Sequence, residues 1–348
     1  MDLRFSKYGF QGRLGGWLVR SACLGALAAL WLGVIPGGAG VRPAHAQGQA
    51  SYKALQKIGC YYHAGDKRLW VATIALDKKY VDPNFYEEEA LSAIIRAGDQ
   101  KFNIDGKDIL VHPMASFDFP GANKYQFMKY SLVIDYSSSI PAGTQADVLN
   151  SIDEFITRLP LAIEGQLIRF SDKVEKFPFT SKKSDIQIQL RQPIAYGMTA
   201  LHDALMEAAT SLAQNKANTP VRVLVLFTDG FDTSSQTYKD RTNFISSFVD
   251  LVKSEGIVVA VIGVTKERDD ALLNSITDRS RGVIGLYVPI EDFDKLRAAF
   301  TQIENMFKNT VIFRFPKRGP DRGRAEISLG MRTKGGSFNT FQVFECEY

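Results

Sequence analysis

The sequence predicts an α/β protein built on a mostly parallel, doubly wound sheet with helices on both faces. Three runs of the chain are continuously apolar, namely LVID, RVLVLF and IVVAVIGV. Strands that are covered on both faces have this composition, whereas strands with one face in water alternate. Segments with helical spacing separate the three runs, and an alternation of strands and helices is typical of a parallel sheet.

This alternation extends from residue 127 to residue 308. The predicted strands are residues 127–135, 163–170, 222–227, 257–264 and 285–290, with a short hairpin-like piece at 174–180. The predicted helices are residues 148–159, 200–214, 240–254, 271–280 and 293–307. In the second of these helices, the apolar residues recur at the spacing of one helical face. They are Leu201, Leu205, Ala208 and Leu212.

The regions on either side of this domain are predicted to be rich in β-strands. In residues 47–126, a strand is expected near 69–76, a short helix near 86–96, and a hairpin around Asp105-Gly106, a pair suited to a tight turn. The tail, residues 309–348, contains three further strand-like runs. We predict that the tail packs with the N-terminal region as a smaller β-rich module.

Residues 1–46 have the form of a signal peptide. Basic residues come first, an apolar stretch from Ala22 to Ile35 follows, and Ala44-His45-Ala46 has the small-x-small form of a cleavage site. The apolar stretch is shorter than the ~20 residues that a membrane span needs, which disfavours an uncleaved anchor. We expect an exported bacterial protein, periplasmic or at the cell surface, with no transmembrane span after cleavage.

Removal of this leader would change the charge of the protein. The leader holds five of the 42 lysines and arginines and one of the 38 acidic residues, so 37 of each remain. A neutral protein has no general electrostatic reason to bind nucleic acid. The basic tail from Arg314 to Arg324 could contact an anionic polysaccharide or surface, although a solvated loop between strands is the simpler interpretation.

Two cysteines would remain after cleavage, because Cys23 leaves with the leader. They are Cys60 and Cys346, one near each end of the mature chain. An even pair in an exported protein predicts a disulfide. The alternative is two unpaired buried thiols.

Small oxygen-bearing side chains follow the core strands. Asp135, Ser137 and Ser139 come directly after one strand, Thr199 precedes a helix, and Asp229 follows RVLVLF. Ligands of open parallel sheets collect beyond the carboxyl ends of the strands. Two carboxylates with several hydroxyls, and neither His nor Cys, suit a hard cation. A serine-rich helix cap would also explain residues 135–139, but it would not require Thr199 and Asp229.

With these residues the chain resembles a von Willebrand factor type A (vWA) domain, a Rossmann-like fold, over residues 127–308. The three segments match its metal-ion-dependent adhesion site (MIDAS), whose first motif, D-x-S-x-S, is Asp135, Ser137 and Ser139 here. The resemblance implies that the two serines and Thr199 bind one Mg²⁺ or Mn²⁺, while Asp135 and Asp229 hold coordinated waters. It also implies that a Glu or Asp of a partner protein fills the open metal position.

The expected function is therefore metal-dependent protein interaction of the adhesion type, without catalysis. A periplasmic assembly or maturation factor for a metalloenzyme or a secretion or pilus machine is the alternative, and a scaffold with a structural metal is another. A metal-dependent hydrolase is less favoured, because neither a phosphate-binding G-x-x-x-x-G-K-[ST] loop nor a G-x-S-x-G elbow occurs. His202 could act as a base near Ser139, but an exposed or capping helical histidine is the simpler interpretation.

Overall fold

The computed structural model describes eleven segments of the chain. They are residues 55–63, 68–75, 100–104, 107–111, 125–138, 142–194, 197–216, 219–308, 310–316, 324–332 and 338–347. The predicted leader, the predicted helix at 86–96, the Asp105-Gly106 turn and the predicted ligand Ser139 lie outside these segments.

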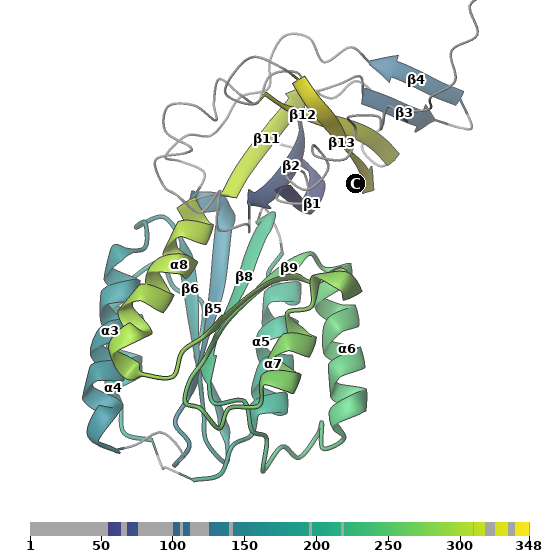
Figure 1. Cartoon of the computed structure of the whole chain (residues 1–348). Helices are drawn as coiled ribbons and strands as arrows, with labels where there is room; N and C mark the ends of the chain where they lie inside the picture. Colours follow the sequence, from purple (N-terminus) through teal and green to yellow (C-terminus); the bar gives the residue numbers. More distant parts are fainter. Residues whose placement is uncertain are drawn as a thin grey trace, which may run out of the picture. The chain divides into compact units, whose positions relative to one another are not determined.

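A six-stranded sheet forms the centre of the α/β domain, in the order β10-β9-β8-β5-β6-β7 (Figure 1). All neighbours pair in parallel except the short edge strand β7, which is antiparallel to β6. The prediction of a mostly parallel sheet is confirmed. The strands are β5 (Met128–Asp135), β6 (Glu164–Phe170), β7 (Val174–Lys176), β8 (Val221–Thr228), β9 (Ile257–Gly263) and β10 (Ile284–Pro289).

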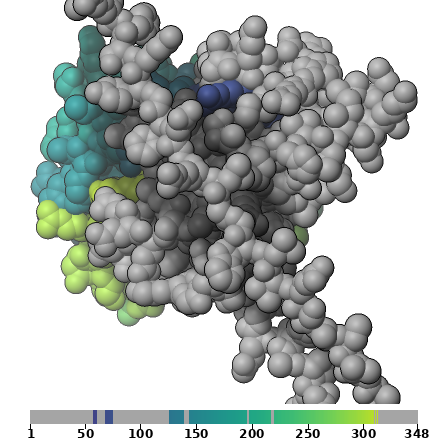
Figure 2. Space-filling view, turned by 90° about the horizontal axis from the view of Figure 1, so that it is seen from above, coloured from purple at the N-terminus to yellow at the C-terminus, as the bar shows by residue number. Residues whose placement is uncertain are grey.

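Helices cover both faces of this sheet, because its central strands are apolar on both sides. On β5, Leu132 and Ile134 belong to one buried cluster and Val133 belongs to the other. The first cluster includes residues of α3 (Gln145–Arg158), α4 (Lys183–Arg191) and α8 (Leu296–Lys308). The second includes residues of α5 (Leu201–Gln214), α6 (Arg241–Ser254) and α7 (Asp270–Ile276). Figure 1 shows the two helical layers, and Figure 2 shows α8 in yellow-green beside teal residues of its own layer.

Strands from before and after the α/β domain pair with each other in two further sheets. One has the order β1-β2-β11, from β1 (Leu55–His63), β2 (Arg68–Ala75) and β11 (Thr310–Pro316). The other has the order β13-β12-β3-β4, from β3 (Gln100–Ile104), β4 (Lys107–Val111), β12 (Arg324–Arg332) and β13 (Phe338–Glu347). The antiparallel pairs β2–β11 and β3–β12 join the two ends of the chain.

The β1-β2-β11 sheet contacts the α/β domain where the central strands begin. The ring of Trp70 meets that of Phe127, just before β5, edge to face, with 4.4 Å between the centroids. Gly256, just before β9, has a φ of +62°, and a Cβ at this position would clash with the carbonyl oxygen of Ile58. The carboxyl ends of the parallel strands lie at the opposite edge of the central sheet.

Cys60 is disulfide-bonded in the structure. It lies on β1, and β1 contacts β13, the strand that includes Cys346. Both facts support the predicted Cys60–Cys346 pairing, which stays a prediction. Within the described segments, every helix is too short or too polar to cross a membrane.

Candidate metal centre

The predicted site residues lie where parallel strands end side by side. β5 and β8 pair in parallel, with Ile134 opposite Phe227, so Asp135 and Thr228 come next to each other at the edge of the sheet. Asp229 follows Thr228 directly. Asp135 and Asp229 are each 3% exposed. The fold therefore buries two carboxylates at one edge of the sheet.

The carboxylate of Asp135 accepts hydrogen bonds from Ser137 and Thr228. Its Oδ1 accepts from the backbone N–H of Ser137 at 2.8 Å, and its Oδ2 accepts from the hydroxyl of Thr228 at 2.6 Å. Its pKa rises to about 7, chiefly because burial disfavours the charged form. The hydrogen bonds from Thr228 and Ser137 lower the pKa, whereas the negative charge of Asp229 raises it further. The two carboxylates are thus close enough to repel each other.

Thr199 reaches this edge through backbone contacts between loops. Ser137 forms a parallel β-bridge with Gly197, and the N–H of Ser138 donates to the carbonyl of Gly197 at 3.1 Å. The N–H of Thr199 donates to the hydroxyl of Thr233 at 2.8 Å, and its carbonyl accepts from the N–H of Thr233 at 2.8 Å. The three predicted ligand loops are therefore joined to one another by main-chain hydrogen bonds.

Gly230 lets the chain turn sharply after Asp229. Its φ is +87°, and a Cβ here would lie 3.1 Å from a carbon of Leu273, so both conformation and space favour glycine. Its N–H donates to the hydroxyl of Thr228 at 3.0 Å, and the N–H of Phe231 donates to Oδ1 of Asp229 at 3.3 Å. The turn thus fixes the direction of the Asp229 carboxylate.

The first turn of α5, directly after Thr199, is capped by side chains of another loop. Ala200 stands at the N-cap position and makes no side-chain cap. Instead, the N–H of His202 donates to Oδ1 of Asp232 at 3.1 Å, and the N–H of Asp203 donates to the hydroxyl of Ser235 at 3.0 Å. These bonds satisfy donors that a helix start would otherwise leave unpaired. The loop that follows Asp229 therefore also holds the helix that follows Thr199.

His202 is part of the protein core. It is 4% exposed, its ring stacks on Phe244 with 4.1 Å between centroids, and Nδ1 lies 2.8 Å from the carbonyl oxygen of Tyr238. The prediction of an exposed histidine is thus wrong, because Phe244 of α6 covers the ring of His202. The ring is engaged in packing and in a hydrogen bond to the backbone.

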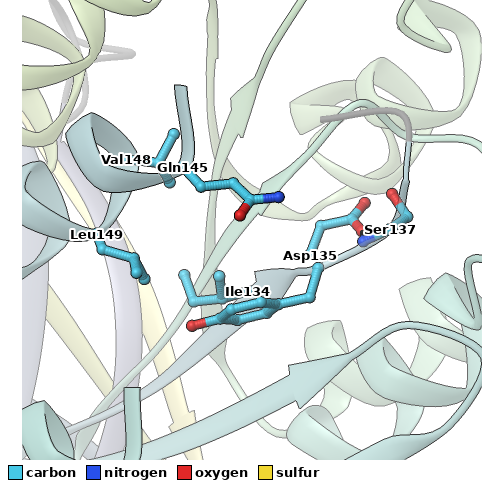
Figure 3. Close-up of a pocket in the computed structure, with 7 residues that line it drawn as sticks. Ile134, Asp135, Ser137, Gln145, Val148 and Leu149 are labelled. Atoms are coloured by element: carbon cyan, nitrogen blue, oxygen red, sulfur yellow. Dashed lines mark hydrogen bonds between the residues drawn. The ribbon is translucent and has the colours of Figure 1, made fainter. Parts of the chain in front are cut away.

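A small cavity adjoins Asp135 on the side of α3. It is lined by the end of β5 and the first turns of α3, with Gln145, Val148 and Leu149 on the helix. Figure 3 shows the side-chain amide of Gln145 extending into the same space as the carboxylate of Asp135. The sequence motif did not reveal that Gln145 lines this cavity or that Thr228 bonds to Asp135.

The described side chains fit a divalent cation bound by oxygen. Two buried like charges and adjacent hydroxyls are what a hard cation requires, and they are costly without one. Among the described residues, no three His, Cys, Asp or Glu side chains are grouped to hold a metal, which excludes a thiolate or imidazole cage there. The hydroxyl ligands named by the motif stay a prediction.

The family comparison agrees with this fold. Residues 131–302 match the family model described as von Willebrand factor type A domain. No curated protein matches the sequence significantly. Solved structures that resemble the chain include proximal thread matrix protein 1 from the mussel byssus, with 22% identity over 53% of this chain and 47% of that one, and a TM-score of 0.42. This chain thus spans about half the length of that protein, of which a structure with a zinc-occupied MIDAS motif is also solved.

Two microbial structures are also similar. One is a von Willebrand factor type A protein from Catenulispora acidiphila, with 11% identity over 84% of this chain and 72% of that one, and a TM-score of 0.46. The other is the PilB minor pilin from Streptococcus sanguinis, with 17% identity over 52% and 61% and a TM-score of 0.42. These resemblances are to the fold alone. With the family match and the sheet topology together, the chain is a von Willebrand factor type A domain protein, and residues 131–302 match the model of that domain.

Proposed function

We propose that this protein is an exported interaction protein that holds one Mg²⁺ or Mn²⁺ at the carboxyl edge of its central sheet. The metal binds a Glu or Asp side chain of a partner protein. In this proposal the hydroxyls of Ser137, Ser139 and Thr199 bind the ion, and Asp135 and Asp229 hold its coordinated waters.

The observation that carries the proposal is the pair of buried carboxylates. Asp135 and Asp229 are both 3% exposed, and the negative charge of Asp229 raises the pKa of Asp135. The groups that shift the pKa of Asp135 include no cationic side chain of the described residues. A divalent cation beside the pair would offset both the burial and the repulsion.

The charge balance explains why the ion would accept an external ligand. Two aspartates against a doubly charged cation leave the site neutral, and the remaining ligands are neutral hydroxyls and waters. Such a cation keeps its attraction for a further carboxylate, and Mg²⁺ retains waters that a ligand can replace. The partner's carboxylate would complete the coordination.

The first test measures metal binding directly. Residues 47–348 would be titrated with Mg²⁺, Mn²⁺ and Zn²⁺ by calorimetry, as wild type, as Asp135→Ala and as Asp250→Ala. Asp250 is an exposed acid on α6, so it controls for a general loss of negative charge. We expect one ion per chain for wild type and for Asp250→Ala, and none for Asp135→Ala. Equal binding by all three would exclude the proposed site.

The second test identifies the partner protein. The same protein would be used as bait in an envelope fraction, with Mg²⁺, with EDTA, and as Asp135→Ala with Mg²⁺. A partner retained only by wild type with Mg²⁺ supports metal-bridged recognition, and a periplasmic enzyme or secretion complex as that partner would favour the assembly-factor alternative. If chelation lowers the melting temperature but releases no partner, the metal is structural.

A further inference from the structure

Two large apolar side chains stand exposed beside the proposed metal ligands. Within the described segments, four large hydrophobic residues are exposed: Leu161 at 80%, Ile188 at 62%, Met198 at 58% and Phe231 at 46%. Met198 directly precedes Thr199, and Phe231 is two residues after Asp229. Aromatic residues and Met are enriched at protein interfaces. Half of the exposed large apolar side chains thus adjoin one predicted site.

The backbone around Met198 is fixed by its neighbours. The carbonyl of Gly197 accepts from Ser138, and the N–H of Thr199 donates to the hydroxyl of Thr233 at 2.8 Å. Because both adjoining residues are held, local rearrangement that would bury Met198 also breaks bonds between the ligand loops. Its exposure follows from the geometry that places Thr199.

Phe231 is fixed in a similar way. Its N–H donates to the Asp229 carboxylate at 3.3 Å, and Gly230 before it adopts a φ of +87° against Leu273. The same turn therefore directs Asp229 and presents the ring of Phe231. A rigid aromatic side chain loses little conformational freedom when a partner covers it.

The charge near Met198 restricts the partner further. The carboxyl group of Asp172 lies next to Gly197, because a Cβ on that glycine would be 3.3 Å from the Asp172 side chain. Asp172 is exposed, so it would repel a second acidic residue of the partner on this side. The surface thus combines one site for a carboxylate with apolar contacts and a nearby negative charge.

We propose that Met198 and Phe231 select the partner: a polypeptide segment with one Asp or Glu whose nearest neighbours are apolar, and no second acid beside it. The acid binds the metal, and the apolar neighbours pack on Met198 and Phe231. This inference rests on the proposed metal-bridging function. It adds the chemistry that surrounds the carboxylate.

The test is a phage-displayed dodecapeptide library, selected in Mg²⁺ on residues 47–348 and sequenced. Three proteins would be compared: wild type, Met198→Gln/Phe231→Gln, and Leu161→Gln/Ile188→Gln. The last is the matched control. Leu161 precedes β6 and so lies at the edge opposite the metal site, and Ile188 lies on α4. The control therefore also replaces two exposed apolar side chains, but not the two beside the proposed ligands. Mg²⁺ affinity and melting temperature should be the same for all three.

We expect wild type and the control to select single acids with apolar neighbours. The Met198→Gln/Phe231→Gln protein should keep the acid but lose the apolar neighbours, and it should bind a wild-type-selected peptide about tenfold or more weakly by fluorescence anisotropy. Acids selected without apolar neighbours, or the same peptides from all three proteins, would overturn this inference and leave the metal bridge standing. Selection of peptides without acidic residues, or peptide binding that EDTA does not abolish, would overturn both this inference and the proposed metal bridge.

Discussion

The hydroxyl of Thr228 donates a 2.6 Å hydrogen bond to Oδ2 of Asp135, across 93 residues of sequence. Both side chains are buried, and the same hydroxyl accepts from the N–H of Gly230 at 3.0 Å. Thr228 therefore connects the first proposed metal loop to the turn that follows Asp229. The two loops thus contact each other directly, and the contact includes the carboxylate of Asp135.

Replacing Thr228 with Val should weaken this connection without changing the shape of the side chain. The Asp135 carboxylate and the N–H of Gly230 would each lose a partner in a buried site, so we expect the free energy of unfolding to fall by about 1–3 kcal/mol. Because the Thr228 bond lowers the pKa of Asp135, its loss should also move metal binding to higher pH. Urea unfolding and metal titration measure these two effects. Thr228→Ser, which keeps the hydroxyl, should resemble wild type; equal losses in Ser and Val variants would contradict the role of the hydroxyl.

Metal affinity should depend on pH around neutrality. Without metal, burial chiefly raises the pKa of Asp135 from 3.8 to about 7, whereas metal binding favours the ionised form. Below that pKa the ion must displace a proton, so we expect affinity to increase roughly tenfold per pH unit up to about pH 7 and to level off above it. Calorimetry in two buffers of different ionisation enthalpy would detect the released proton. Constant affinity from about pH 5.5 to about pH 8.5 would show that Asp135 does not couple to the ion.

The mostly parallel sheet and most of its strands and helices were predictable because their causes are local. The continuous apolar runs predicted β5, β8 and β9 to within about a residue or two, since burial on both faces requires such composition. Helix α4 (Lys183–Arg191) was missed. Its apolar residues Ile186, Ile188 and Leu190 alternate as in a strand, yet only Ile186 and Leu190 are buried, at the i, i+4 spacing of a helix. Because Ile188 is exposed, the apolar residues of this segment do not show a clear helical pattern in the sequence.

The candidate site was predictable only in part. Asp135, Ser137, Thr199 and Asp229 could be identified because the motif places them directly after strands or before a helix. Thr228 and Asp232 could not, because each contacts a residue far away in the sequence. The register of β5 against β8 sets the Thr228 contact, and the path of the loop after Asp229 sets the Asp232 contact. Contacts of this kind depend on the folded arrangement, which a motif does not contain.

Asp232→Ala should disturb both the stability and the metal site. Asp232 caps the start of α5 through the N–H of His202 and accepts a hydrogen bond from the hydroxyl of Ser235, so its loss should cost about 0.5–2 kcal/mol of stability. Because α5 begins directly after Thr199, we also expect metal affinity to fall severalfold. Chemical denaturation and metal titration of the same samples separate the two effects.

The matched control for Asp232 is Asp240, which caps α6 by accepting from the N–H of Asn243 at 2.7 Å. Asp240→Ala removes a cap of the same kind from a helix that supplies none of the proposed ligands. It should lower stability by a similar amount and leave metal affinity at the wild-type value. If both variants weakened metal binding equally, the effect would reflect general destabilisation, and Asp232 would have no special role in positioning Thr199.

The Cys60–Cys346 pairing predicts that residues 47–348, prepared under oxidising conditions, contain no free thiol. The pairing is supported because Cys60 is disulfide-bonded and because its strand β1 contacts β13, which includes Cys346. Thiol labelling of the denatured protein should detect two cysteines only after reduction, and Cys346→Ser should leave one reactive thiol. Two free thiols in the oxidised wild type would contradict the prediction.

The loop closed by this disulfide would span nearly the whole mature chain, for which loop entropy gives an upper figure of roughly 5 kcal/mol. Reduction should therefore lower the stability of the β1-β2-β11 sheet before that of the central sheet, because β1 carries one end of the bridge. Amide exchange followed strand by strand, with and without reductant, would show whether the loss begins there.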